Sequence, residues 1–213
     1  MTPAERLQSV RERIARAAKA ARRDPRDITL IAVSKTRSVE EIEALIAAGH
    51  RDFGESRVQE ALEKWPPLKA AHPDIRLHMI GRLQSNKAGE AAALFDSVHS
   101  LDRPSLLEAL GRANYAGPCF VQVNIGEEAQ KGGVALHELA GLIESVRRSS
   151  VPLAGLMAIP PLDAQPAPYF ALLAKLARRH DVKGLSMGMS ADYETAVMLG
   201  ATHVRVGSAL FED

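Results

Sequence analysis

Disulfide bonds and an aromatic-rich core are excluded by what the sequence lacks. Its 213 residues include one cysteine, Cys119, so no internal disulfide can form. Only 4% of the residues are aromatic. A core made of Ala, Leu, Val and Ile favours helices packed on aliphatic strands over an aromatic-rich sandwich, so we do not expect an all-β fold.

The sequence also lacks an excess of charge of either sign and any long apolar run. With 27 Lys and Arg against 26 Asp and Glu, its formal charge is +1, which gives no overall attraction to nucleic acid or to an anionic membrane. Apolar runs such as 28–33 are far shorter than the roughly 20 residues that cross a bilayer. The N-terminus lacks the charged-then-apolar pattern of a signal peptide. We therefore expect a cytoplasmic protein that binds neither nucleic acid nor membrane.

Helix and strand patterns alternate along nearly the whole chain. Thr2-Pro3-Ala4-Glu5 is typical of a capping box and predicts an amphipathic N-terminal helix. From residue 27 onward, short apolar runs alternate with helical patterns, as in repeated βα units. The predicted strands are 28–34, 51–54, 76–80, 97–100, 118–125, 152–159, 184–187 and 202–206. The helical patterns that follow cover 39–48, 55–64, 85–94, 104–112, 135–147, 167–179 and 191–199.

Eight successive βα units predict an α/β fold, a (β/α)8 TIM-type barrel with an extra N-terminal helix. The alternative is an open doubly wound sheet, but the nucleotide fingerprints GxGxxG and GxxxxGK[ST] are absent. Only 208–213 follow the last predicted strand, so we expect residues 1–213 to form a single domain.

Lys35 is the first candidate for chemistry, because the site of such a barrel lies at the carboxyl ends of its strands. It directly follows a strand apolar enough to be buried on both faces. An amine at this position is partly removed from water and can attack a carbonyl carbon to form a Schiff base. The alternative is a lysine that simply leaves the barrel for solvent.

The turns after the last two predicted strands are typical of a phosphate site. Residues 185–190 and 205–208 are short segments with glycine and hydroxyl groups, as in the phosphate sites between the last two strands of many barrels. Ser190, at the expected start of a helix, and Ser208 are the candidate hydroxyls, although each could be an ordinary helix cap. Arg205 could face a phosphate, a heteroaromatic nitrogen that it would hold unprotonated, or an acidic neighbour.

A lysine that forms a Schiff base beside a phosphate site indicates either a phosphosugar aldolase or a pyridoxal 5'-phosphate (PLP) protein. Five motifs narrow this choice, because together they resemble the pyridoxal phosphate homeostasis protein family. The motifs are Val33-Ser34-Lys35-Thr36, Phe53-Gly54-Glu55-Ser56-Arg57-Val58-Gln59-Glu60, His78-Met79-Ile80-Gly81-Arg82-Leu83-Gln84-Ser85-Asn86-Lys87, 185–190 and 204–208. The resemblance implies a barrel like the N-terminal domain of alanine racemase standing alone, with PLP held as a Schiff base on Lys35.

The resemblance also implies roles for individual residues. Phosphate would be bound by Ser190, Gly207 and Ser208, with Ser186 and Gly188 completing the turn, and Arg205 would face the pyridine nitrogen. Two positions depart from the family pattern, since Ser56 stands where asparagine is common and Arg82 where proline is usual. Ser56 is shorter than asparagine, so its contact near the O3' atom of the cofactor is lost or bridged by water.

The function implied is binding, buffering and delivery of PLP within the cell, without a catalytic residue or turnover. The alternative is a racemase-like enzyme acting on amino acids. Such an enzyme needs a second base, and Tyr169 and Tyr193 fall in helical patterns that do not place them over the cofactor. The protein partners considered are PLP-dependent apo-enzymes, and the resemblance favours a monomer. His78 is interpreted as a packed core histidine, and no metal is expected because no metal-ligand spacing is found.

Overall fold

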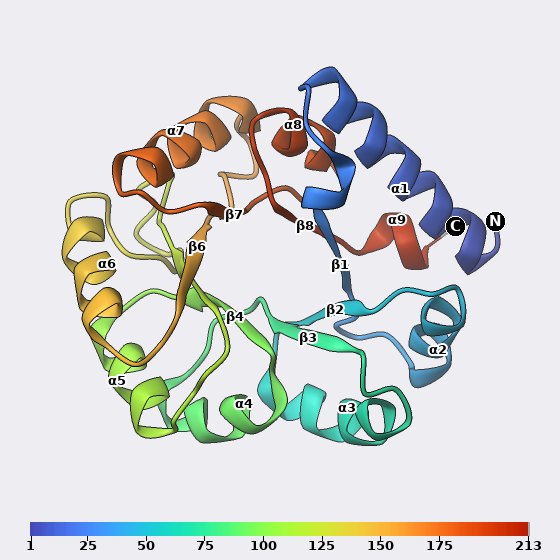
Figure 1. Ribbon diagram of the computed structural model, residues 1–213, viewed down its shortest axis with the longest axis horizontal. Coiled ribbons are helices and arrows are strands. Elements are labelled where there is room, and N and C mark those ends of the chain that lie inside the picture. Colours follow the sequence, from blue (N-terminus) through green and yellow to red (C-terminus); the bar gives the residue numbers. More distant parts are fainter. Residues whose placement is uncertain (213) are drawn as a thin grey trace.

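Eight parallel strands close into a barrel in the computed structural model, which describes residues 1–212 (Figure 1). Each strand pairs with the next in the sequence, and β8 returns to pair with β1. The predicted (β/α)8 TIM-type barrel is confirmed, and the open-sheet alternative is wrong. The strands are β1 (Thr29–Val33), β2 (Asp52–Glu55), β3 (Arg76–Met79), β4 (Ser97–Leu101), β5 (Cys119–Gln122), β6 (Leu153–Met157), β7 (Gly184–Ser186) and β8 (His203–Val206).

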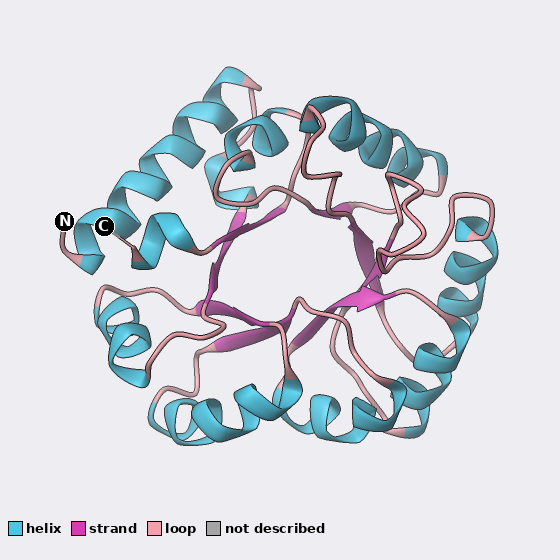
Figure 2. Cartoon of the chain, turned by 180° about the vertical axis from the view of Figure 1, so that it is seen from behind, coloured by secondary structure: helices cyan, strands magenta, loops and turns pink. Residues whose placement is uncertain are grey.

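Helices surround the strands on the outside, as the view from behind in Figure 2 shows. They are α1 (Pro3–Ala20), α2 (Val39–Ala47), α3 (Val58–Ala71), α4 (Ala88–Leu94), α5 (Pro104–Arg112), α6 (Leu139–Arg148), α7 (Pro166–Arg179), α8 (Tyr193–Met198) and α9 (Ser208–Phe211), with short 3-10 helices η1 (Pro25–Asp27) and η2 (Ser85–Lys87). The extra helix α1 begins with the predicted capping box between Thr2 and Glu5 and packs against α8 and α9. Within residues 1–212, no helix has both the length and the apolar character needed to span a bilayer.

The largest difference from the predicted boundaries concerns α3. The pattern predicted a helix over 55–64, whereas the helix spans Val58–Ala71 and contains two prolines. Proline lacks the N–H of a helical residue and usually ends a helix. Here Trp65 and Leu68 are buried against the core and hold the segment in helical form. Glu55 ends strand β2 and does not begin the helix.

Side chains alternate along each strand between an outer core and the barrel interior. The outward set is apolar and packs under the helices, as do Leu30 and Phe53. The inward set is identified by register, because paired residues of neighbouring strands point to the same side of the sheet. Ile31 on β1 pairs with Arg205 on β8, so both side chains face the barrel axis.

The interior of this barrel is rich in polar groups, whereas bulky branched apolar side chains usually fill such barrels. Register and hydrogen bonds place five buried polar residues there: Asp52, His78, His99, Ser186 and Arg205. The buried apolar residues Ile31, Phe120 and Met157 lie apart from the outer core and fill the remaining space. The barrel interior therefore offers hydrogen-bond donors and acceptors as well as packing.

Glycine on β6 and β7 makes room for the ring of Phe120 inside the barrel. A Cβ atom on Gly155 would lie 2.3 Å from the carbonyl oxygen of Gly184 and 2.6 Å from Cδ1 of Phe120. We expect Gly155→Ala to lower the free energy of unfolding by about 2 kcal/mol, because overpacking forces the backbone apart. Urea unfolding measures this change.

The matched control is Gly141→Ala in α6, where an added Cβ meets no atom within 4 Å. This change should be neutral or stabilising, because alanine favours a helix over glycine by about 1 kcal/mol. Equal stability of the Gly155→Ala variant and the unaltered protein would contradict the packing argument.

Candidate functional site

Lys35 lies in the turn directly after β1, at the carboxyl end of the barrel. The hydroxyl of Ser34 points outward to Glu55 at 2.8 Å. Lys35 is the next residue, in the turn itself. Its side chain is exposed. The expectation that the amine is partly removed from water is therefore wrong, and Lys35 is open to reaction from solvent.

The turn that carries Lys35 has a strained backbone held by α3. Thr36 adopts a φ of +62°, which is rare for a β-branched residue. Its N–H donates to the carboxylate of Glu60 at 2.5 Å. The Nζ of Lys64 donates to the carbonyl of Ser34 at 2.9 Å and to Glu60 at 2.8 Å. The helix thus fixes the backbone on both sides of Lys35.

Glu55 supports the same turn from inside the outer core, a role that sequence reasoning missed. Its side chain is fully buried. Its Oε1 accepts hydrogen bonds from Ser34 Oγ at 2.8 Å and Trp65 Nε1 at 3.0 Å, and it pairs with Lys64 at 2.9 Å. A buried carboxylate is tolerated only with such partners. The glutamate of the Phe-Gly-Glu motif is therefore a brace between β1, β2 and α3.

Ser190 joins the two turns that were predicted to bind phosphate. Its Oγ accepts the backbone N–H of Gly207 at 3.1 Å. The expectation that Ser190 caps a helix over 191–199 is wrong, because α8 begins at Tyr193. The hydroxyl is used instead to hold the β7–α8 turn against the β8–α9 turn.

Glycine is required in the first of these turns, whereas in the second a Cβ atom would make only ordinary van der Waals contacts. Gly188 has a φ of +93°, and a Cβ there would lie 2.6 Å from Cβ of Ala196. A Cβ on Gly207 would lie 3.5 Å from Cβ of Val33. The second turn therefore lies against the end of β1, beside the turn that carries Lys35. Ser208 follows, exposed, at the start of α9.

Arg205 is buried inside the barrel without a carboxylate partner. Its Nη1 donates to Ser186 Oγ at 2.6 Å and its Nη2 to the carbonyl of Ala158 at 3.1 Å. In residues 1–212 no acidic side chain forms an ion pair with it, so the alternative of a salt bridge is wrong. Burial lowers the pKa of Arg205 to about 10, which leaves it charged at neutral pH. Two of its five N–H donors have protein acceptors, so the others can serve a ligand.

The structure places the hydroxyl of Ser186 away from the turn that it was predicted to complete. The side chain is fully buried and lies between Arg205 and Nδ1 of His99, at 2.6 Å and 2.8 Å. This hydroxyl is therefore committed within the barrel. Sequence reasoning did not single out His99, since a histidine in a short strand resembles any other core residue.

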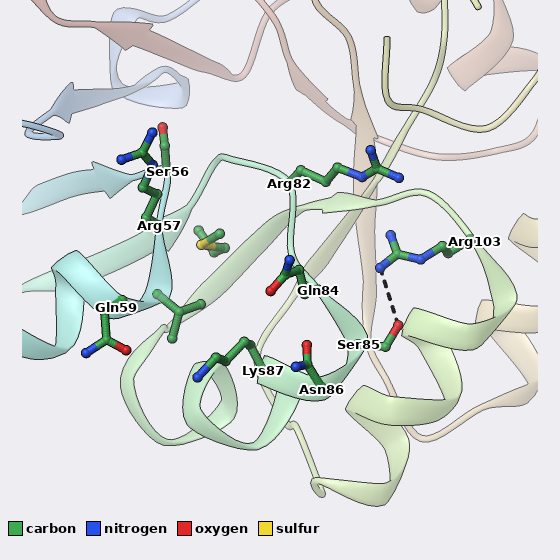
Figure 3. A pocket seen from close by; sticks show the side chains of 11 residues that line it. Ser56, Arg57, Gln59, Arg82, Gln84, Ser85, Asn86, Lys87 and Arg103 are labelled. Atoms are coloured by element: carbon green, nitrogen blue, oxygen red, sulfur yellow. Dashed lines mark hydrogen bonds between the residues drawn. The ribbon is translucent and has the colours of Figure 1, made fainter. Parts of the chain in front are cut away.

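Ser56 follows β2 and lines a cavity of about 780 Å³ together with residues that follow β3 and β4. Figure 3 shows Arg82, Gln84 and Lys87 around this cavity, with Arg103 hydrogen-bonded to Ser85 at 3.3 Å. The loop after β3 passes close to Ser56, and only glycine fits at position 81, because a Cβ there would lie 2.2 Å from the carbonyl oxygen of Ser56. The two positions that depart from the family pattern thus line one cationic cavity.

The geometry defines a class of protein. It is a (β/α)8 barrel of the alanine racemase N-terminal type, with a lysine in the turn after β1 and turns that contain glycine and serine after β7 and β8. A family model described as alanine racemase, N-terminal domain, matches residues 6–213. The pyridoxal phosphate homeostasis protein of Pseudomonas aeruginosa is 43% identical over 220 residues, covering 99% of this chain and 95% of that protein. The protein of the same name from Aquifex aeolicus is 39% identical and covers 99% of this chain and 98% of the relative.

Solved structures agree with this class. PipY of Synechococcus elongatus with PLP bound has a TM-score of 0.84 and 35% identity, over 98% of this chain and 99% of PipY. Alanine racemase of Acinetobacter baumannii has a TM-score of 0.74 at 16% identity, over 98% of this chain and 61% of the racemase, which is a likeness of fold. The chain belongs to the pyridoxal phosphate homeostasis protein family, as its motifs predicted.

Lys64 should be essential for the stability of the Lys35 turn. We expect Lys64→Met to lower the free energy of unfolding by about 3 kcal/mol, because it leaves the buried Glu55 carboxylate without its cation. Urea unfolding followed by circular dichroism tests this. The control is Lys175→Met, at an exposed position of α7, which should change stability by less than about 0.5 kcal/mol. A loss no larger than that of the control would contradict the brace.

Three histidines, of which His50 and His99 are buried and His203 is half-buried, should make the protein sensitive to acid. Burial lowers the pKa of His50 and of His203 to about 4, and lowers the pKa of His99 well below its usual value. Each therefore binds a proton more readily in the unfolded chain, where its pKa is about 6.5. Their contribution to stability is complete above that pH and is lost as the pH falls toward 4.

We expect the free energy of unfolding to fall between pH 7.5 and 5.0 by about 2 kcal/mol for each of His50 and His203, with a further fall from His99. Urea unfolding at the two pH values measures the fall. His203→Asn keeps a polar atom for Thr202, which contacts Nδ1 of His203 at 2.9 Å, and should show a smaller fall. Stability that does not change over this range would show that these histidines are not held neutral.

Proposed function

We propose that residues 1–213 form one PLP-binding domain that carries, buffers and delivers the cofactor to PLP-dependent apo-enzymes, without turnover of its own. The observation that carries the proposal is the grouping of three features at one end of the barrel. Lys35 is an exposed amine, the turn with Gly207 lies against β1, and Arg205 is a buried cation with free donors. Cytoplasmic location and a monomeric state belong to the same proposal.

The residues present fit the chemistry of PLP. When bound, PLP supplies an aldehyde that condenses with a primary amine and releases one water, and a ring that can withdraw electrons. Lys35 provides the amine at the mouth. The hydroxyls of Ser190 and Ser208 provide donors for a phosphate at these turns, where the Gly207 N–H is itself used to hold Ser190 Oγ. The solved structure of PipY, at 35% identity, contains PLP.

Arg205 favours binding over turnover. A guanidinium donates hydrogen bonds but does not accept them, so it leaves a facing pyridine nitrogen unprotonated. An unprotonated ring withdraws electrons less strongly, and carbanion chemistry is disfavoured. The relatives from Pseudomonas aeruginosa and Aquifex aeolicus are named as homeostasis proteins, which supports the same conclusion.

The tyrosines considered as a second base also support a role in binding. Tyr193 is buried on α8, with the guanidinium of Arg13 from α1 lying 5.5 Å from its ring centre. Tyr169 packs against the outer core from α7. Both lie on the helical side of the barrel wall. Neither is placed over the mouth, where a racemase would need a base on the second face of its substrate.

Lys35 is the residue to test. Purified protein mixed with PLP should show the visible absorption band of a Schiff base, and borohydride followed by peptide mass mapping should place the reduced adduct on Lys35. We expect Lys35→Ala to lose the band and Lys175→Ala to keep it. An adduct that maps to another lysine would refute the proposed site.

Absence of turnover is tested separately. The PLP-loaded protein is incubated with single L-amino acids, and chiral chromatography measures the D-enantiomer. We expect no conversion above that of the Lys35→Ala variant. Conversion at enzyme-like rates would favour the racemase-like alternative.

A further inference from the structure

Five polar side chains form a continuous hydrogen-bonded chain through the interior of the barrel. It runs from Arg205 near the mouth to Ser186 at 2.6 Å, and from Ser186 to Nδ1 of His99 at 2.8 Å. Nε2 of His99 lies 3.1 Å from Nδ1 of His78, and Nε2 of His78 lies 3.1 Å from Asp52. All five residues are buried, and they come from β8, β7, β4, β3 and β2.

The two ends of the chain determine the direction of its hydrogen bonds. A guanidinium can only donate, so Ser186 accepts from Arg205 and has its own hydrogen left to donate. The acceptor for that hydrogen is Nδ1 of His99. A neutral imidazole that accepts at Nδ1 carries its hydrogen on Nε2, and so His99 donates to His78.

The same reasoning places the hydrogen of His78 on Nε2, directed at Asp52. The carboxylate of Asp52 can only accept while it is ionised, and its hydrogen bonds with His78 and Arg76 hold its pKa below the usual value despite burial. Every donor in the chain therefore points from the mouth toward the opposite end of the barrel. Hydrogen bonds aligned in this way polarise and strengthen one another.

Aromatic rings pack around the two histidines of the chain. His99 is stacked on Phe120 with ring centres 4.3 Å apart. His203 on β8 packs edge-on, 5.6 Å from His99 and 6.4 Å from His78, but its Nδ1 contacts Thr202 and so it stands outside the chain. Among residues 1–212, the charged groups in contact with the chain are Arg205 at one end and Asp52, paired with Arg76, at the other.

We propose that Ser186 and His99 are positioning residues for Arg205, and that the Asp52 carboxylate at the far end of the barrel sets the direction of the whole chain. The proposal rests on the proposed function in one respect, that Arg205 faces the ring nitrogen of PLP. Ser186 holds the guanidinium by one of its nitrogens and so limits how it can turn. The far end of the barrel, where Arg76 meets solvent, thereby influences the mouth.

The tautomers of the two histidines test the chain without any cofactor. Protein labelled with 15N at histidine is examined by long-range 1H–15N correlation at pH 7.5. We expect both His99 and His78 to carry a single hydrogen on Nε2. A hydrogen on Nδ1 of His99, or a doubly protonated His78, would overturn the proposed direction. Because PLP is absent, this result does not depend on the proposed function.

Ser186→Ala tests the link to Arg205. We expect its Kd for PLP, followed by the visible band, to rise about tenfold, as for the loss of one hydrogen bond to a charged group. Competition by inorganic phosphate should be unchanged, since the phosphate turns do not use this hydroxyl. The matched control is Ser100→Ala, which removes a buried hydroxyl that has no hydrogen-bond partner within residues 1–212. Equal Kd values for the two variants would overturn the positioning role.

Asp52→Asn tests action at a distance and does not depend on how Ser186→Ala folds. The amide can still accept from His78 but carries no charge. We expect the 15N signals of His78 and His99 to shift and the Kd for PLP to rise severalfold. Asp74→Asn, at an exposed aspartate that pairs with Arg51, should change neither. If Asp52→Asn also changes neither, Asp52 does not set the direction of the chain.

If the unaltered protein shows no visible band with PLP, the proposed function fails, and the NMR result still decides the chain.

Discussion

The pairing of β8 with β1 is the contact on which the candidate site depends. It places His203–Val206 beside the first strand, with Arg205 level with Ile31. The turn after β8 then lies against Val33, next to the turn that carries Lys35. Parallel strands end on the same side of a barrel, so closure alone brings an amine, a glycine turn and a buried cation to one opening. Without this pairing, Lys35 would lie at one edge of an open sheet, and Arg205 and the turn after β8 would lie at the other.

Closure also creates an interior, and this protein fills much of it with polar groups. Burying such groups costs free energy unless each has a hydrogen-bond partner. The partners here are one another, because Ser186, His99 and His78 each contact the next residue in line between Arg205 and Asp52. The outer core of aliphatic side chains supplies the stability that the interior does not, and the interior is left to orient a cation.

A second set of buried charges holds the reactive turn. Glu55 and Lys64 pair within the layer between strands and helices, and Glu60 accepts the N–H of Thr36. The strained backbone beside Lys35 is thus maintained by contacts from α3. Such strain persists only where the surroundings over-determine it. Two separate hydrogen-bond networks therefore hold the site: one supports the turn that carries Lys35, and the other supports the side chain of Arg205.

The order of the βα units, the amphipathic α1 and the positions of Lys35, Ser190, Arg205 and Gly207 at strand ends could all be read from the sequence, because periodicity and turn residues are local properties. The partner of each side chain could not. The Ser190 hydroxyl accepts a hydrogen bond from Gly207, and the Ser186 hydroxyl accepts one from Arg205. No local sequence pattern pointed to the contacts of His99 and Asp52. Those contacts are set by strand register and barrel closure, which arise from many long-range contacts that no short segment contains.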